Sequence, residues 1–489
     1  MPERPKKKVL ILTLGTGRKL PSGAPAGYMM TSYQLEETGE IVESAYVAES
    51  LVSAFRPDMI FIIGTIKSSW LEFYQYFTPG NTEKEELLFC ELDPASGRDV
   101  SGEELRRATE SINKILAGGL NREPFSRAVP TRAILTRYGM NNEELLENYQ
   151  LLSGIKNWLE PDTDYEIAFD ITHSFRSLPV YNLIILNYLS VISSANLDIT
   201  HIYYGNMDAG REKGGITPIL DLHDLISVMH LSSGVSEFKN TGNCRTLLEQ
   251  IPETESELRK ALENFDWATQ VNSFDKVQKS LTELLRITER EQTDSSRYAD
   301  LNHMINEVLR RKFLNLKDDR EKASEVWERM SIADRRLMTA KWYLNQNRYG
   351  QAAATAYEAL KSHLVPVYLK KVKAEVREED YLNEDYLTDA IRRLSYVYTC
   401  LKRRKSSLSG MEEFFLELEG TRKKAVIVRN RFAHNLTERG SKWPGTMTSD
   451  QEKAHVSRLV RLIERLKKEI ADHPDEVEHV YTKGLIMTE

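Results

Sequence analysis

Short, almost entirely apolar runs alternate with amphipathic stretches along the first half of the chain. The apolar runs predict buried strands over Val9–Leu14, Met59–Ile63, Ala133–Thr136, Tyr165–Asp170 and Ile199–Tyr204. The stretches between them have helical spacing over Glu43–Phe55, Glu103–Leu116, Glu143–Leu159 and Leu178–Val191, and Tyr28–Leu35 has the pattern of a small hairpin. Strands that are apolar throughout and separated by helices indicate an α/β domain with a mostly parallel sheet covered on both faces.

Strand patterns end near Glu253, and the second half of the chain has only helical periodicity. Leu337–Leu344 and Ala352–Leu360 predict a helical pair around the turn Asn345–Gly350, where a series of alanines would let the two helices approach closely. We therefore predict an α/β domain over residues 1–234 and an all-α part over residues 235–489, with Ser232–Gly234 as the hinge.

Composition narrows the class of protein. The chain has 489 residues, of which 41% are hydrophobic and 28% charged, as in globular proteins, and a net charge of -7, which excludes a broad basic surface for nucleic acid. Any RNA contact must then be a local patch. Cys90, Cys244 and Cys400 form no CxxC pair, so neither a disulfide framework nor a zinc cluster is indicated. The apolar run Val9–Leu14 lacks a cleavage site, and no run approaches the length of a membrane span, so we expect a cytoplasmic protein without membrane contact.

Four segments follow predicted strands, residues 15–19, 64–68, 170–177 and 205–206, and glycine, hydroxyl groups and a cation recur among them. Because the carboxyl ends of parallel strands share one edge, these segments predict a phosphate-binding site there. Glycines and hydroxyls also cap helices in any α/β protein, and no Rossmann or Walker motif is present, so only the recurrence on one edge favours a ligand. Arg176 and Thr172 are the strongest candidates for phosphate contacts, while His173 fits a ligand contact or a turn hydrogen bond equally well. The candidates are Gly15, Thr16, Gly17, Arg18, Gly64, Thr65, Lys67, Thr172, His173, Ser174 and Arg176.

In the helical part, the segment from Val428 to Asn435 contains Arg429, Asn430 and His434. Metal-free RNA cleavage needs a group that moves protons near neutral pH and a fixed cation for the charge on the phosphorane, which histidine and arginine supply. On a straight helix, Arg429 lies more than a third of a turn from His434. Either the helix ends within the motif, or a second copy of the chain completes the site. A structural role for this histidine is the alternative, since the spacing alone is a weak pattern.

Basic residues surround this motif, and no metal-binding spacing accompanies it. The run from Thr421 to His434 contains no acidic residue, although such a run is also typical of a solvated helix face. The remaining histidines show neither HExxH nor paired ligand spacing, and we expect no metal and no cofactor. The cations of the run are Arg422, Lys423, Lys424, Arg429 and Arg431.

At this point the chain resembles a known family. Arg429–His434 (RNRFAH) is similar to the R-x4–6-H motif of HEPN ribonucleases, and Trp342–Glu358 resembles an earlier helical pair of HEPN domains. Leu12–Gly17, Ile63–Trp70 and Asp170–Pro179 (DITHSFRSLP) look like the loop motifs of CARF sensor domains, which are Rossmann-like. A CARF domain followed by a HEPN domain is the order of the accessory ribonucleases of type III CRISPR systems.

The resemblance implies an allosteric antiviral ribonuclease. Its activator would be a cyclic oligoadenylate, with cyclic tetra-adenylate favoured, bound across the interface of a homodimer or higher oligomer without stable association with the CRISPR complex. A composite HEPN site, with Arg429, Asn430 and His434 as catalytic residues, would cleave single-stranded RNA without metal. His173 departs from the glycine that related loops often carry. The alternatives are a regulator whose helical domain does not cut, and a CARF domain that also degrades its own activator.

Overall fold

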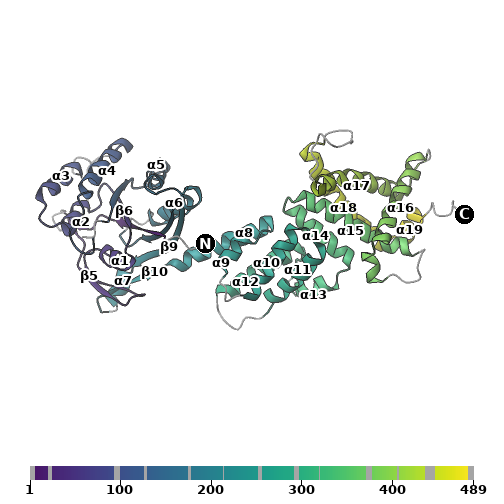
Figure 1. The fold of residues 1–489 in the computed structure, drawn as a ribbon, viewed down its shortest axis with the longest axis horizontal. Helices are drawn as coiled ribbons and strands as arrows, with labels where there is room; N and C mark the ends of the chain where they lie inside the picture. Colours follow the sequence, from purple (N-terminus) through teal and green to yellow (C-terminus); the bar gives the residue numbers. More distant parts are fainter. Residues whose placement is uncertain are drawn as a thin grey trace. The chain divides into compact units, whose positions relative to one another are not determined.

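The computed structural model describes residues 6–19, 25–92, 100–125, 129–173, 178–212, 214–251, 256–290, 297–318, 320–370, 377–404, 407–434 and 447–482. The chain divides into two compact units, residues 1–227 and residues 228–489 (Figure 1). The first unit is built on an eight-stranded sheet, and the second is helical. This is the predicted order of an α/β domain followed by an all-α part.

The sheet has the order β5-β4-β10-β9-β8-β1-β6-β7. The five consecutive strands from β9 to the edge strand β7 are parallel to one another. These are the five strands that the apolar runs predict. A short ribbon, β2 (Arg18–Lys19) with β3 (Pro25–Gly27), follows the first strand. The strands of the sheet are β1 (Lys7–Leu14), β4 (Thr31–Leu35), β5 (Ile41–Ser44), β6 (Met59–Thr65), β7 (Thr131–Thr136), β8 (Asp164–Asp170), β9 (Asn196–Gly205) and β10 (Ile216–Asp221).

Helices cover both faces of the sheet, which explains why its strands are apolar throughout. Along β1, Leu10 and Leu12 pack into the core on the side of α1–α4, whereas Val9 and Ile11 pack on the side of α5 and α6. The capping box of Ser101 and Glu104 starts α4 at Gly102, one residue before the predicted start at Glu103. The helices of this unit are α1 (Ala48–Phe55), α2 (Trp70–Phe77), α3 (Thr82–Leu92), α4 (Gly102–Leu116), α5 (Asn142–Ser153), the 3₁₀ helix η3 (Gly154–Trp158), α6 (Leu178–Ile192) and α7 (Met207–Glu212).

Two expectations about the chain path are wrong. Tyr28–Leu35 is not a hairpin by itself: Thr31–Leu35 is the single strand β4, which pairs with β5 and β10. Ser232–Gly234 is not a linker either, because it lies inside α8 (His223–Thr241), within which the division between the units also falls. Gly234 is there for packing, since a Cβ on it would lie 3.0 Å from the backbone nitrogen of Leu247.

The carboxyl-terminal part of the helical unit packs around α15 (Tyr349–Leu369), which contacts α14, α16, α17 and α18 (Figure 1), while α10 to α13 pack on one another in a second core. Ala352, Ala353 and Ala356 are buried along it, so the predicted close approach to α14 is confirmed. The other helices are α9 (Arg245–Gln250), α10 (Ser256–Gln270), α11 (Phe274–Thr288), α12 (Arg297–Val308), the π-helix η4 (Leu309–Phe313), α13 (Ala323–Arg329), α14 (Ile332–Asn345), the 3₁₀ helix η5 (Glu378–Leu382), α16 (Glu384–Arg403), α17 (Gly410–His434), α18 (Ser449–Asp472) and α19 (Pro474–Thr482). In the described part of the chain, no helix has the length and apolar character needed to cross a bilayer.

Candidate functional site

The loops after β1 and β6 are joined by hydrogen bonds at the carboxyl edge of the sheet. The Ser68 hydroxyl donates to the carbonyl of Leu14 (2.6 Å) and accepts from the N–H of Thr65 (2.9 Å). The N–H of Ser69 donates to the carbonyl of Gly15 (2.8 Å). These bonds fix the second loop against the first. Trp70 is buried and its indole N–H donates to the carbonyl of Thr65, so this side chain is part of the core.

The loops after β8 and β9 are joined through Thr172. Its N–H (2.9 Å) and hydroxyl (2.5 Å) both donate to Asp170 Oδ1, and the hydroxyl accepts from the N–H of Gly205 (2.8 Å). The donor proton of Thr172 is therefore already used inside the protein. A phosphate oxygen accepts hydrogen bonds, so this hydroxyl can donate to one only by giving up Asp170. Thr172 thus holds the loops together here.

The first and third loops also touch, at Gly15. A Cβ on Gly15 would lie 2.3 Å from the carbonyl oxygen of His173, so only glycine allows this approach. The N–H of Gly15 donates to the hydroxyl of Tyr28 (2.9 Å), whose ring lies 4.2 Å from the imidazole of His173. Gly17 has a φ of 64°, in the left-handed region. The structure therefore brings all four predicted loops together at one edge.

Burial shifts the acid–base properties of two groups in this edge. Burial raises the pKa of Asp170 to about 6, although hydrogen bonds from Thr172 and the backbone oppose the shift. Burial lowers the pKa of His173 to about 4, so its imidazole is neutral at pH 7. Asp170 Oδ2 and His173 Nε2 have no hydrogen-bond partner among the described residues. The two roles considered for His173 were a ligand contact and a turn hydrogen bond. Among the described residues Nε2 makes no turn hydrogen bond, and the ring packs on Tyr28.

The remaining predicted residues differ in accessibility. Thr16 and Lys67 are exposed, and the Lys67 ammonium lies 5.9 Å from the Tyr138 ring. Thr65 is buried. Ser174 and Arg176 lie outside the described residues, and so does the side chain of Arg18.

Sequence reasoning missed the loop after β7. Arg137, Tyr138 and Gly139 follow that strand with the same mixture of cation, hydroxyl and glycine, so the criterion applied to the other loops would have found them. Arg137 Nε lies 2.7 Å from Glu147 Oε2. Tyr28 was missed as well, because the sequence pattern placed it in a hairpin and not in a loop that follows a strand.

The second candidate site lies at the carboxyl end of α17. The helix continues through His434, so the expectation that it ends within the motif is not met, and completion by a second copy remains. The Arg429 guanidinium lies 5.1 Å from the ring of Tyr357 on α15, and Nη1 donates to Asn430 Oδ1 (3.3 Å). The side chain of His434 is outside the described residues.

Most of the basic run on α17 is neutralised. Arg422 is buried and bonds to Glu419, which is fully buried two residues before the run begins. Arg431 pairs with Glu452 of α18. Lys423 Nζ lies 3.7 Å from Glu419 Oε1, and Lys424 is exposed. Among the described residues, Arg429 has no carboxylate partner; its contacts are Tyr357 and Asn430.

Comparison with known proteins identifies the fold of the α/β unit. Residues 19–208 match the family model for the CARF domain of the CRISPR system endoribonuclease Csx1. The N-terminal unit has the CARF fold. Downstream of the CARF domain, residues 227–318 match the model for the second domain of the CRISPR-associated protein MJ1674. Neither model reaches α17.

Two individual proteins are also similar. The chain is 26% identical over 349 residues to the CRISPR-associated protein MJ1674 of Methanocaldococcus jannaschii, covering 70% of this chain and 51% of that protein, so it spans about half the length of this relative. Csm6 of Enterococcus italicus, solved with cyclic hexa-2'-fluoro-hexa-dAMP, aligns over 98% of both chains at 10% identity with a TM-score of 0.33. That likeness is too distant to support an argument.

Proposed function

We propose that this protein is a CRISPR-associated endoribonuclease in which the CARF domain binds a cyclic oligoadenylate and the helical unit cleaves single-stranded RNA. One observation carries the proposal: Arg429 keeps its charge without a carboxylate partner among the described residues, while Arg422 and Arg431 beside it are paired. An unneutralised guanidinium is the group needed to stabilise a phosphorane dianion. The match of residues 19–208 to the Csx1 CARF domain supports the sensing half.

The proposed reaction needs no metal in the RNA site. The 2′-oxygen attacks the adjacent phosphorus, the P–O5′ bond breaks, and the fragments carry a 2′,3′-cyclic phosphate and a 5′-hydroxyl. One imidazole takes the proton of the 2′-OH, and another gives a proton to the leaving 5′-oxygen. Each chain supplies one His434, so two copies provide both groups, with Arg429 stabilising the charge between the two steps.

The CARF domain has a surface suited to such a dimer. Val180, Ile184, Tyr188 and Val191 recur at helical spacing along α6, and all four are exposed, with Ile184 60% and Val191 79% accessible. An apolar stripe of this kind is typical of an interface. Two copies of the loop edge would then present identical groups to the two halves of an even-sized ring.

The dimer can be tested on α6. We expect Ile184→Glu to yield a monomer by sedimentation, because the carboxylate would be buried unpaired in the interface. Leu87→Glu, on the exposed surface of α3, is the matched control and should leave the dimer intact. An unchanged dimer in the first variant would remove α6 from the interface.

The function is tested with labelled single-stranded RNA incubated with the protein in EDTA, with or without cyclic tetra-adenylate or hexa-adenylate. We expect cleavage only with a ring, and mass spectrometry should find 2′,3′-cyclic phosphate ends. A ring that binds without any RNA cleavage would instead support the non-catalytic regulator. Cleavage of the ring itself would support a sensor that degrades its activator, and a requirement for added metal would contradict the mechanism.

A further inference from the structure

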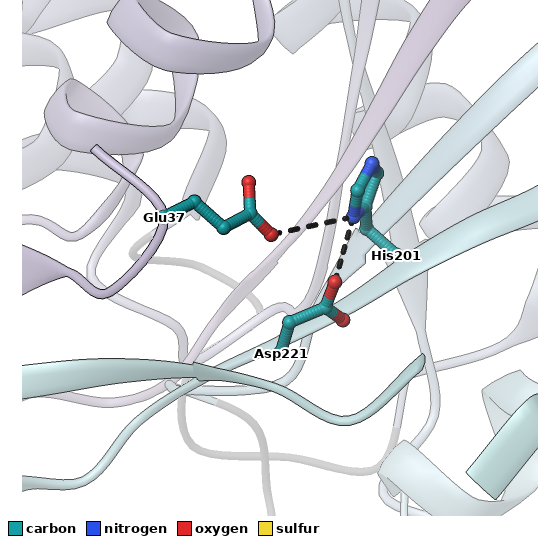
Figure 2. Close-up of side chains that lie close together, drawn as sticks. All are labelled: Glu37, His201 and Asp221. Atoms are coloured by element: carbon teal, nitrogen blue, oxygen red, sulfur yellow. Dashed lines mark hydrogen bonds and ion pairs between the residues drawn. The ribbon is translucent and has the colours of Figure 1, made fainter. Parts of the chain in front are cut away.

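Three potential metal ligands from separate segments meet on the sheet of the CARF domain (Figure 2). His201 is on β9, Asp221 ends β10, and Glu37 lies in the turn between β4 and β5. His201 Nδ1 is 2.7 Å from Asp221 Oδ2 and 3.9 Å from Glu37 Oε1. One donor atom from each residue lies within 4.8 Å of the other two. No sequence motif joins these residues.

A β-bulge aims His201 at this point. Along β9, Ile199 pairs with Ile167, but His201 pairs with Ala168, so Thr200 is an extra residue. The bulge turns His201 and Tyr203 toward the α1 side of the sheet, where the imidazole lies 5.9 Å from Phe55, while Ile199 stays in the core on the opposite side. Bulges commonly redirect side chains in this way beside functional sites.

The ligand orientations are fixed by neighbouring groups. Asp221 Oδ1 accepts the N–H groups of Ile202 (3.1 Å) and His223 (2.9 Å), which leaves Oδ2 to face the imidazole. The ring of Tyr203 stacks on His201 with centroids 5.2 Å apart and planes 7° apart. The other ring nitrogen, Nε2, faces Glu166 Oε1 at 3.8 Å. A carboxylate behind a ligating histidine is the usual outer partner in metal sites.

The charges around the imidazole favour a divalent ion. The carboxylates of Glu37, Asp221 and Glu166 face His201, and Lys8 lies 3.9 Å from Glu166. Three carboxylates therefore face one imidazole, which is a donor set that suits a divalent ion. The exposure of Glu37, 49% for its side chain, leaves room for water as a further ligand.

We propose that Glu37, His201 and Asp221 bind a divalent transition-metal ion that ties the β4–β5 turn to β9 and β10. Donor atoms about 2.1 Å from a zinc ion lie about 3.4 Å from one another in a tetrahedral site. The observed separations of 2.7 and 3.9 Å fall on either side of that value, so small side-chain rotations suffice. One imidazole with two carboxylates suits zinc and manganese. The ion is a clamp within the CARF domain and takes no part in the RNA site.

The test is direct metal binding by the full-length protein. After dialysis against chelator and then buffer, titration with zinc or manganese should show one site per chain by calorimetry, and saturation should raise the Tm by several degrees. Glu37→Gln changes an exposed turn residue that is safe for folding, and His201→Gln removes the imidazole. Each should weaken binding at least tenfold, because one ligand is lost.

His223→Gln is the matched control, since its ring lies 6.5 Å from that of His201 without being a ligand, and it should bind metal like the wild type. Absence of a stoichiometric site, or wild-type affinity in both Glu37→Gln and His201→Gln, would overturn the proposal and leave an ion-paired cluster. RNA cleavage is not the readout, so a failure here leaves the proposed ribonuclease untouched, and the reverse also holds.

Discussion

At the loop edge of the CARF domain, polar groups bond to one another, whereas at the end of α17 Arg429 has no carboxylate partner in the part of the chain that the structure describes. Thr172 uses its proton on Asp170, Ser68 ties two loops together, and Gly15 lies against His173. The described contacts of Arg429 are the ring of Tyr357 and the side chain of Asn430. The first region is held together by hydrogen bonds within its own chain, although Asp170 Oδ2 and His173 Nε2 have no partner among the described residues, whereas the described part of the second region offers the guanidinium of Arg429 no carboxylate.

This difference suggests how the two regions would work. A preformed edge binds a ligand without first paying to order its loops, which favours affinity and a defined pose. We expect the guanidinium of Arg429, which lies on a continuous helix, to act only when groups of a second copy approach it. Sensing would then require little local change, and activation would consist of bringing two helix ends together.

The largest effect should come from His434→Ala. Removal of a general acid–base group typically costs about 10³-fold in kcat, and here we expect that loss with ring binding and dimerisation unchanged. Single-turnover RNA cleavage measures it. His479→Ala, an exposed histidine on α19, is the control and should cleave normally. If the two variants cleave RNA equally well, His434 has no part in the reaction.

Asp170→Asn tests whether burial of Asp170 in the loop edge makes the stability of the protein depend on pH. Burial raises the pKa of Asp170 in the folded chain to about 6, above the ordinary value near 3.9 of an unfolded chain. The folded state thus holds this proton more tightly, so stability falls as pH rises between these values, by roughly 3 kcal/mol for two pKa units. We expect the wild type to lose Tm relative to Asp170→Asn between pH 4 and pH 7. Parallel curves would contradict the shift.

Gly15→Ala tests the contact between the first and third loops. The added Cβ would meet a backbone carbonyl that cannot move independently, and overpacking of this kind costs about 2 kcal/mol. Ring affinity should fall with the Tm, because the edge must open. Gly154→Ala is the matched control, with open space around its Cβ and a helical φ of -64°, and it should be neutral or slightly stabilising. Equal behaviour of both variants would mean that the contact at Gly15 does not hold the edge.

The parallel strands were predictable because burial on both faces leaves an uninterrupted apolar run. The strand β10 was not, because Pro218 interrupts its pattern, and β4 is recognisable only from its pairing with β10. The loop edge was predictable in outline, since parallel strands must end together. Tyr28 was missed because it reaches the edge through tertiary packing.

The residue types of the α17 motif could be recognised from the sequence, but the ion pairs around the motif could not. Its basic run seemed unopposed because Glu419 lies just before it and Glu452 on another helix, and both neutralise arginines of the run. The Glu37–His201–Asp221 group was invisible in the sequence for a related reason. Its residues lie on two strands, β9 and β10, and in the turn between β4 and β5. A one-residue bulge in β9 decides on which face of the sheet His201 lies. Local sequence patterns do not predict which residues from distant segments come into contact.

The smallest effect should come from Tyr357, which holds the guanidinium of Arg429 in place of a carboxylate. A cation over an aromatic face contributes about 0.5–1 kcal/mol where it is accessible, and it leaves the positive charge intact. We therefore expect Tyr357→Leu to lower kcat about three- to fivefold with little change in KM, since the charge remains but its position relaxes. Tyr357→Phe keeps the ring and should restore kcat. Arg422 also lies over this ring, so Tm is measured alongside. A loss of Tm with kcat unchanged would give Tyr357 a purely structural role. Tyr357 would then not position the guanidinium of Arg429 for catalysis.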